Sequence, residues 1–253
     1  MQFSANLGFL WSDLPLTEAI RRAKKAGFDA VECHWPYDTP SSEVAAALVE
    51  TGLVMLGLNT RRGGEGENGL LAVPGREQEA RSAIDEAIDY AVATGTQAVH
   101  AMAGIASGRI AHTTYLENLS YACSKAKKHS ITILIEPLNP YDAPGYFLNT
   151  AAQAESIIRE LGQPELRLMF DVYHHQITAG DICRSFDALL PIIGHVQIAS
   201  VPMRARPDLG EVDYRFVLSH LKACGWSRPV GAEYRANGPT EDSLGWLSDF
   251  RTL

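Results

Sequence analysis

Short apolar runs rich in β-branched residues alternate with longer segments of helical period along the whole chain. In the longer segments apolar residues recur three and four positions apart, as at Leu16, Ala19, Ile20 and Ala23, which is typical of helices with one buried face. Strict alternation of strands and helices predicts a parallel sheet. The apolar runs predict eight strands, over residues 3–7, 30–34, 54–58, 98–102, 131–136, 166–171, 195–199 and 230–234.

Glycine residues mark the ends of four predicted helices, at Gly27, Gly52, Gly95 and Gly225. A glycine directly after a helix adopts the left-handed conformation that caps the helix C-terminus, so we expect short turns between helices and the strands that follow. Thr150 followed by Gln153 predicts a capping box that begins the fifth helix. The irregular sequence lies in the connections from strand to helix, over residues 61–75, 139–149 and 200–212.

Eight strand–helix units in 253 residues match the size and count of an α/β fold of the (β/α)8 type, a TIM barrel. No linker, charge block or low-complexity tract interrupts the series, so a single barrel domain over residues 1–253 is expected. A doubly wound open sheet is the alternative. That fold favours a glycine-rich phosphate loop after the first strand, and residues 7–11, Leu-Gly-Phe-Leu-Trp, do not form one.

Composition and charge narrow the function. The chain is 46% hydrophobic and has a net charge of −8, which disfavours nucleic acid and anionic membranes as partners because polyanion affinity comes from Lys and Arg. No apolar run approaches the roughly 20 residues that cross a bilayer, and residues 1–6 do not resemble a signal peptide, so a cytoplasmic protein is expected. The cysteines lack the spacing of disulfide frameworks or zinc ribbons and are predicted to be reduced: Cys33, Cys123, Cys183 and Cys224.

Polar residues at the ends of the predicted strands are the candidates for function, because TIM barrels carry their active sites at the C-terminal ends of the strands. They are Asn6, Glu32, His34, Asn59, His100, Glu136, Asp171, Gln197 and Glu233.

The last four of these candidates follow strongly apolar runs on the fifth to eighth strands. Buried carboxylates are unfavourable unless they are paired or bind a cation, and the nearest evident cations, Arg204 and Arg206, share one loop. Three carboxylates and one amide form an all-oxygen set that suits Mg²⁺ or Mn²⁺ rather than zinc. The sequence therefore predicts a divalent metal site, although an ion pair or a capped turn explains any one of the four taken alone.

Several motifs occur in one order and at matching intervals along the chain. Together with residues 3–6 and 74–77, they resemble the family of hydroxypyruvate isomerases and 2-oxo-tetronate isomerases within the xylose isomerase-like barrels, over essentially the full length. The motifs are residues 135–139 (Ile-Glu-Pro-Leu-Asn), 171–174 (Asp-Val-Tyr-His), 194–199 (Gly-His-Val-Gln-Ile-Ala), 210–214 (Gly-Glu-Val-Asp-Tyr) and 231–234 (Gly-Ala-Glu-Tyr).

The resemblance implies a role for individual residues. Glu136, Asp171, Gln197 and Glu233 are implied as ligands of a divalent metal ion, Mg²⁺ or Mn²⁺, and Glu136 and Glu233 also as the acid/base pair. His174 matches a position that contacts a substrate oxygen, the alternative being a structural histidine, which is the role expected of His175. Arg204 matches an arginine that is suited to a substrate carboxylate, and the alternative is a solvated loop arginine. Asn6 and Asn59 are further substrate-binding candidates.

The implied activity is isomerisation of a small 2-oxo, 3-hydroxy acid, with a proton moved between adjacent carbons through an enediolate. A homo-oligomer is a further implication. The alternatives are a ketose 3-epimerase, which generally has His at the position of Gln197, a phosphodiesterase of the endonuclease IV type, and a barrel that binds a sugar acid without turning it over. Two loops depart from the family pattern: residues 59–66 replace a Leu-Pro and Gly-Asp-Trp sequence, and Ser200-Val201 replaces Asp-Asn. Both border the substrate, so the exact substrate stays open.

Overall fold

The computed structural model describes residues 1–253 and contains one eight-stranded parallel sheet in the order β2-β1-β8-β7-β6-β5-β4-β3. The sheet closes on itself between β2 and β3, where backbone hydrogen bonds such as Val31 N–H to Val54 O, 3.0 Å, and Asn59 N–H to His34 O, 2.8 Å, join the two edges. The strands are β1 (Phe3–Asn6), β2 (Ala30–Glu32), β3 (Gly57–Asn59), β4 (Ala98–His100), β5 (Thr132–Ile135), β6 (Leu166–Asp171), β7 (Ile193–Ile198) and β8 (Val230–Ala232).

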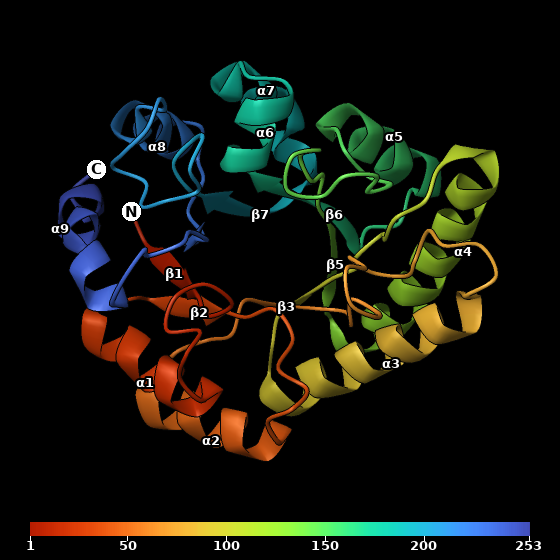
Figure 1. Ribbon diagram of the computed structural model, residues 1–253, viewed down its shortest axis with the longest axis horizontal. Helices are drawn as coiled ribbons and strands as arrows, with labels where there is room; N and C mark the ends of the chain where they lie inside the picture. The colour runs from red at the N-terminus through yellow and green to blue at the C-terminus, as the bar shows by residue number, and fades with distance from the viewer.

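The helices form a ring outside the strands, in chain order around the barrel (Figure 1). This arrangement confirms the predicted (β/α)8 architecture and excludes the doubly wound sheet. The sixth unit contains two helices in place of one. The helices are α1 (Leu16–Ala26), α2 (Ser41–Thr51), α3 (Glu77–Thr94), α4 (Gly108–Ala126), α5 (Ala151–Leu161), α6 (Val172–Thr178), α7 (Ile182–Leu189), α8 (Tyr214–Ala223) and α9 (Gly245–Arg251), with short 3-10 turns at Lys127–His129, Leu190–Ile192 and Thr240–Ser243.

The predicted local signals are confirmed with small shifts. Gly27, Gly52 and Gly95 cap their helices at φ of 93°, 65° and 69°, and the Thr150 hydroxyl accepts a hydrogen bond from the backbone N–H of Gln153. Strands β2, β3, β4 and β8 each span three residues where five are predicted, and β3 is also shifted, to Gly57–Asn59. Residues 54–56 are joined to β2 only through Val31. The sheet closes at this edge, and β2 and β3 meet there without a regular ladder.

Two different environments lie on the two faces of the sheet. The large apolar core fills the space between strands and helices, and α9 completes it by packing Trp246 against Phe3 with a centroid distance of 5.1 Å. Inside the barrel only Ala98, Leu134 and Met169 form an apolar cluster. Most of the other side chains at the C-terminal ends of the strands inside the barrel are polar, and this contrast positions the site. None of the helices is both long and apolar enough to cross a membrane.

Candidate active site

A polar pocket opens inside the barrel at the C-terminal ends of the strands. Its lining contains residues from seven of the strand ends predicted from the sequence: Asn6, Glu32, Asn59, His100, Glu136, Gln197 and Glu233. Period-2 alternation explains the arrangement, because the last inward position of each parallel strand falls at the same end of the barrel. Parallel pairing places Asn6 opposite Glu32 and Asp171 opposite Gln197.

Glu233, directly after β8, accepts hydrogen bonds at both of its carboxylate oxygens. Its Oε1 accepts hydrogen bonds from Asn6 Nδ2 at 3.0 Å and from His34 Nε2 at 2.8 Å, and its Oε2 accepts one from the Arg204 guanidinium at 2.8 Å. The Asn6 amide is fully used, because its Oδ1 accepts from Gly8 N–H at 2.9 Å. Asn6 therefore fixes the position of Glu233. Asn59 lines the pocket with its side chain and accepts a hydrogen bond from the Tyr37 hydroxyl through its carbonyl.

Glu32 is a second buried carboxylate whose role the sequence did not reveal. Its Oε1 accepts from Asn6 Nδ2 at 3.1 Å and from Gln197 Nε2 at 3.0 Å, and its Oε2 is bonded to His195 Nε2. The Gln197 amide is thereby oriented with its nitrogen toward Glu32, which leaves Gln197 Oε1 facing elsewhere. His195 was noted in the sequence only as part of a motif, and its partner lies 163 residues away.

Three of the four predicted metal ligands each present a buried oxygen that has no hydrogen-bond partner: Glu136 Oε1, Asp171 Oδ2 and Gln197 Oε1. Asp171 uses its other oxygen to cap α6, accepting from Tyr173 N–H at 2.8 Å, so the capped-turn alternative accounts for only half of this carboxylate. Buried polar atoms without partners are unfavourable, and an oxygen set of this kind suits a hard cation. These three residues therefore fit the predicted ion, whereas both oxygens of the fourth predicted ligand, Glu233, already accept hydrogen bonds.

His174 lies in a cluster with Glu136 and Asp171 that has the spacing of a metal site. Its Nδ1 accepts a hydrogen bond from the Asn139 backbone N–H at 3.0 Å, so in the neutral ring the proton is on Nε2. Burial lowers the pKa of His174 well below its usual value, which keeps the ring neutral. Nε2 lies 3.8 Å from Glu136 Oε1 and 3.7 Å from Asp171 Oδ2. Nε2 therefore carries a proton and has no hydrogen-bond partner, and this tautomer is unsuited to metal ligation through Nε2.

Arg204 enters the site from the loop after β7, and its side chain is only 11% exposed. The solvated-loop alternative is therefore wrong for Arg204. The guanidinium lies between the rings of Phe9 and Tyr173, 4.8 and 4.9 Å from their centroids, and its NH2 is 3.6 Å from Asp171 Oδ2. Arg206 instead pairs with Asp208 at 3.1 Å.

The loop that carries Arg204 is braced by its own backbone. Ser200 accepts the Arg204 N–H through its carbonyl at 2.8 Å and the Ala205 N–H through its hydroxyl at 3.0 Å. Arg204 itself adopts the left-handed conformation, φ 49°, which is unfavourable for a non-glycine residue and needs such support. Asp142, 3.5 Å from the Arg204 guanidinium, and the two aromatic rings carried no signal in the sequence.

Burial and neighbouring charges separate the pKa values of the carboxyl groups. Burial, with Glu233 and Asp171 nearby, raises the pKa of Glu136 well above its usual value, and burial raises the pKa of Asp171 to about 7. Burial alone would also raise the pKa of Glu233, but Arg204 and His34 lower it to about 2. A pair of carboxyl groups held at different pKa values is the usual arrangement for acid/base chemistry.

Comparison with known proteins shows the family to which this barrel belongs. The family model of the xylose isomerase-like TIM barrel matches residues 20–250. The chain belongs to this family. Within the xylose isomerase-like family it is 38% identical to the 2-oxo-tetronate isomerase of Cupriavidus necator, over 98% of both chains.

Two further similar proteins also match this chain over nearly its full length. The hydroxypyruvate isomerase of Escherichia coli is 34% identical over 99% of this chain and 100% of its own length. A solved structure described as an AP endonuclease, family 2, from Brucella melitensis superposes with a TM-score of 0.94 at 38% identity and covers 98% of both chains. The resemblance derived from the motifs is confirmed over essentially the whole chain.

Gly231 is expected to be essential to the packing beneath the site. A Cβ at this position would lie 2.6 Å from Glu32 Oε1 and 2.9 Å from Gln197 Cγ. Gly231→Ala should therefore lower the free energy of unfolding by about 1 to 3 kcal/mol, the usual cost of overpacking. Thermal unfolding measures this change. Gly57→Ala is the matched control, since its Cβ would meet only a carbonyl oxygen at 3.8 Å; equal stability of the two variants would contradict the prediction.

Proposed function

We propose that this protein is a metal-dependent isomerase of a small 2-oxo, 3-hydroxy acid. The substrate is either hydroxypyruvate, converted to tartronate semialdehyde, or 2-oxo-tetronate, converted to 3-oxo-tetronate. The observation that carries the proposal is the buried Arg204 guanidinium, 2.8 Å from Glu233, together with the separated pKa values of Glu136 and Glu233. A cation of this geometry binds a substrate carboxylate, and the glutamates are placed for proton transfer.

Glu136, Asp171, Gln197 and Glu233 are the proposed ligands of the ion, Mg²⁺ or Mn²⁺. Three of them support this assignment with unpartnered buried oxygens. When bound, such an ion polarises a carbonyl group and stabilises the negative charge that develops on its oxygen.

The protein's own side chains move the proton and orient the acid. One glutamate removes the proton from the hydroxyl-bearing carbon, and the same or the other glutamate returns a proton at the adjacent carbon, while the hydroxyl proton passes to the former carbonyl oxygen. The low pKa of Glu233 keeps this carboxylate ionised, whereas the raised pKa of Glu136 makes its carboxylate the stronger base of the two. His174 donates from Nε2 to a substrate oxygen, and Arg204 binds the carboxylate, so the reacting carbons lie between the two glutamates.

The decisive experiment follows the exchange of carbon-bound protons for deuterium by proton NMR. Hydroxypyruvate or a four-carbon 2-oxo acid should exchange and isomerise in the presence of enzyme with Mg²⁺ or Mn²⁺. A ketose of the same length without a carboxylate should not react, because it offers Arg204 no group to bind. Absence of exchange in every acid tested would contradict the proposed function.

Metal removal provides a separate prediction. Treatment with a chelator, followed by metal analysis to confirm that the protein is metal-free, should reduce turnover to background. Addition of Mg²⁺ or Mn²⁺ should restore it. Full turnover by verified metal-free protein would exclude the metal from the reaction while leaving the isomerase assignment standing.

A phosphodiesterase is the second candidate, because the solved structure at 38% identity is described as an AP endonuclease. Zinc clusters of that type need several histidine nitrogens. Here His34 is bonded to Glu233, His195 is bonded to Glu32, and His174 Nε2 carries a proton. These contacts favour the isomerase, and cleavage of abasic-site DNA by the purified protein would reverse the preference.

A further inference from the structure

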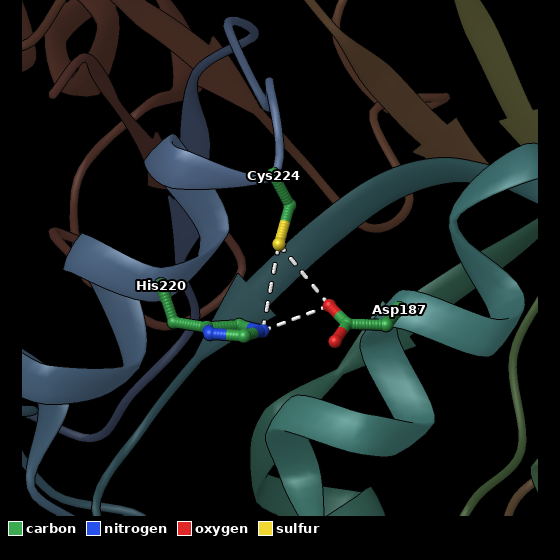
Figure 2. A group of neighbouring side chains, drawn as sticks. All are labelled: Asp187, His220 and Cys224. Atoms are coloured by element: carbon green, nitrogen blue, oxygen red, sulfur yellow. Dashed lines mark hydrogen bonds and ion pairs between the residues drawn. The ribbon is translucent and has the colours of Figure 1, made fainter.

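Three side chains of different chemistry converge on the outside of the barrel, away from the candidate active site (Figure 2). Asp187 belongs to α7, His220 lies in the last turn of α8, and Cys224 is the residue that caps α8. Helices run antiparallel to the strands in this fold, so the C-terminal ends of α7 and α8 lie at the end of the barrel opposite the active site. That end of the barrel contributes to stability rather than to catalysis.

The donor atoms of the three side chains meet at one point. Asp187 Oδ1 lies 2.8 Å from His220 Nε2 and 3.1 Å from Cys224 Sγ, and Cys224 Sγ lies 3.5 Å from His220 Nε2. Tetrahedral zinc with ordinary bond lengths separates such ligand atoms by roughly 3.4 to 3.6 Å. Shifts of a few tenths of an ångström in exposed side chains therefore suffice to accommodate an ion.

The same contacts exclude a catalytic triad. In a Cys–His–Asp triad the imidazole lies between its partners, with one ring nitrogen toward the thiol and the other toward the carboxylate. Here Nε2 alone faces both partners, as Figure 2 shows. Moreover, the hydrogen bond to Asp187 raises the pKa of the Cys224 thiol, which is unfavourable for a nucleophile.

We propose that Asp187, His220 and Cys224 bind a zinc ion that joins α7 to α8. His220 and Cys224 are four residues apart and so lie on one face of the helix end, which lets them chelate one ion together. The fourth position of the ion is open to water. The spacing of the cysteines did not predict such a site, because the partners of Cys224 are a histidine and a carboxylate.

Cobalt(II) is the probe, since it replaces zinc and absorbs strongly in the near-ultraviolet when a thiolate binds it. The proposed catalytic ligands contain no sulfur, so that site does not contribute to the band. We expect the band in the wild-type protein and in the matched control Cys183→Ser, whose cysteine lies one turn before Asp187 on α7. Cys224→Ser should lack the band and retain isomerase turnover. Any other pattern of bands overturns the proposed ligands.

The zinc affinity of the protein tests the other two ligands, Asp187 and His220, in variants that retain Cys224. Asp187→Ala and His220→Ala should each weaken zinc binding by more than about 10-fold, since loss of a mere outer-shell partner already costs 10- to 100-fold. With the barrel-mouth site saturated by Mg²⁺ or Mn²⁺, zinc should raise the unfolding temperature of wild-type protein more than that of Cys224→Ser. Unchanged zinc affinity in either alanine variant, or an unfolding temperature that does not respond to zinc, would contradict the proposal. The three side chains would then form only a hydrogen-bonded cluster.

Discussion

Replacing Glu136 or Glu233 by glutamine is expected to reduce turnover by about 10³-fold or more, within the range that a general acid or base contributes. The two variants should differ in stability. Glu136 is buried among other carboxyl groups and has a raised pKa, so a neutral amide is tolerated there. Glu233 accepts hydrogen bonds from Asn6, His34 and Arg204, and an amide nitrogen in its place should lower the free energy of unfolding by about 1 to 3 kcal/mol.

Steady-state kinetics and thermal unfolding measure the two effects, and metal analysis of each variant separates lost binding from lost proton transfer. Glu160→Gln is the matched control, because Glu160 lies on the surface and pairs only with His112. Wild-type turnover in either Glu136→Gln or Glu233→Gln would exclude that residue from catalysis.

Arg204 should prove specific for arginine. Arg204→Lys keeps a positive charge but loses the planar fork that lies between Phe9 and Tyr173. Loss of one charge-assisted hydrogen bond costs about 1.5 to 3 kcal/mol, so kcat/KM for the acid substrate should fall by about 10- to 100-fold, mainly through KM. Arg206→Lys on the same loop is the control, since Arg206 pairs with Asp208 away from the site. Equal kinetic parameters for the two lysine variants would contradict a role of Arg204 in substrate binding.

The architecture was predictable because its signals are local. Apolar runs, helical period and capping glycines each depend on neighbouring residues, and in a closed parallel barrel they determine which side chains face inward. The sequence therefore predicts that the polar strand ends, among them Glu136 and Gln197, line one pocket. The sequence does not predict that the sixth unit contains two helices, α6 and α7, or that the edge before β3 is irregular. Hydrophobic periodicity shows neither where one helix ends and the next begins nor how two strands pair.

The contacts within the site were not predictable for the opposite reason. His195 reaches Glu32 across 163 residues, and Arg204 turns inward only because its loop adopts an unusual backbone conformation. The cluster of Asp187, His220 and Cys224 joins two helices that are separated in sequence by β7. Such partnerships depend on closure of the barrel rather than on any sequence pattern.

The polar side chains at the barrel mouth fall into two groups, one joined by hydrogen bonds and one with hydrogen-bond acceptors left free. Asn6 is hydrogen-bonded to both Glu32 and Glu233, and the oxygens of these two carboxylates accept further hydrogen bonds. One oxygen each of Glu136, Asp171 and Gln197 has no hydrogen-bond partner. Folding thus leaves an unfavourable desolvation of these oxygens that the proposed ion would relieve. If the proposed ion binds here, the resistance of this enzyme to heat and proteases should depend on the concentration of free metal around it.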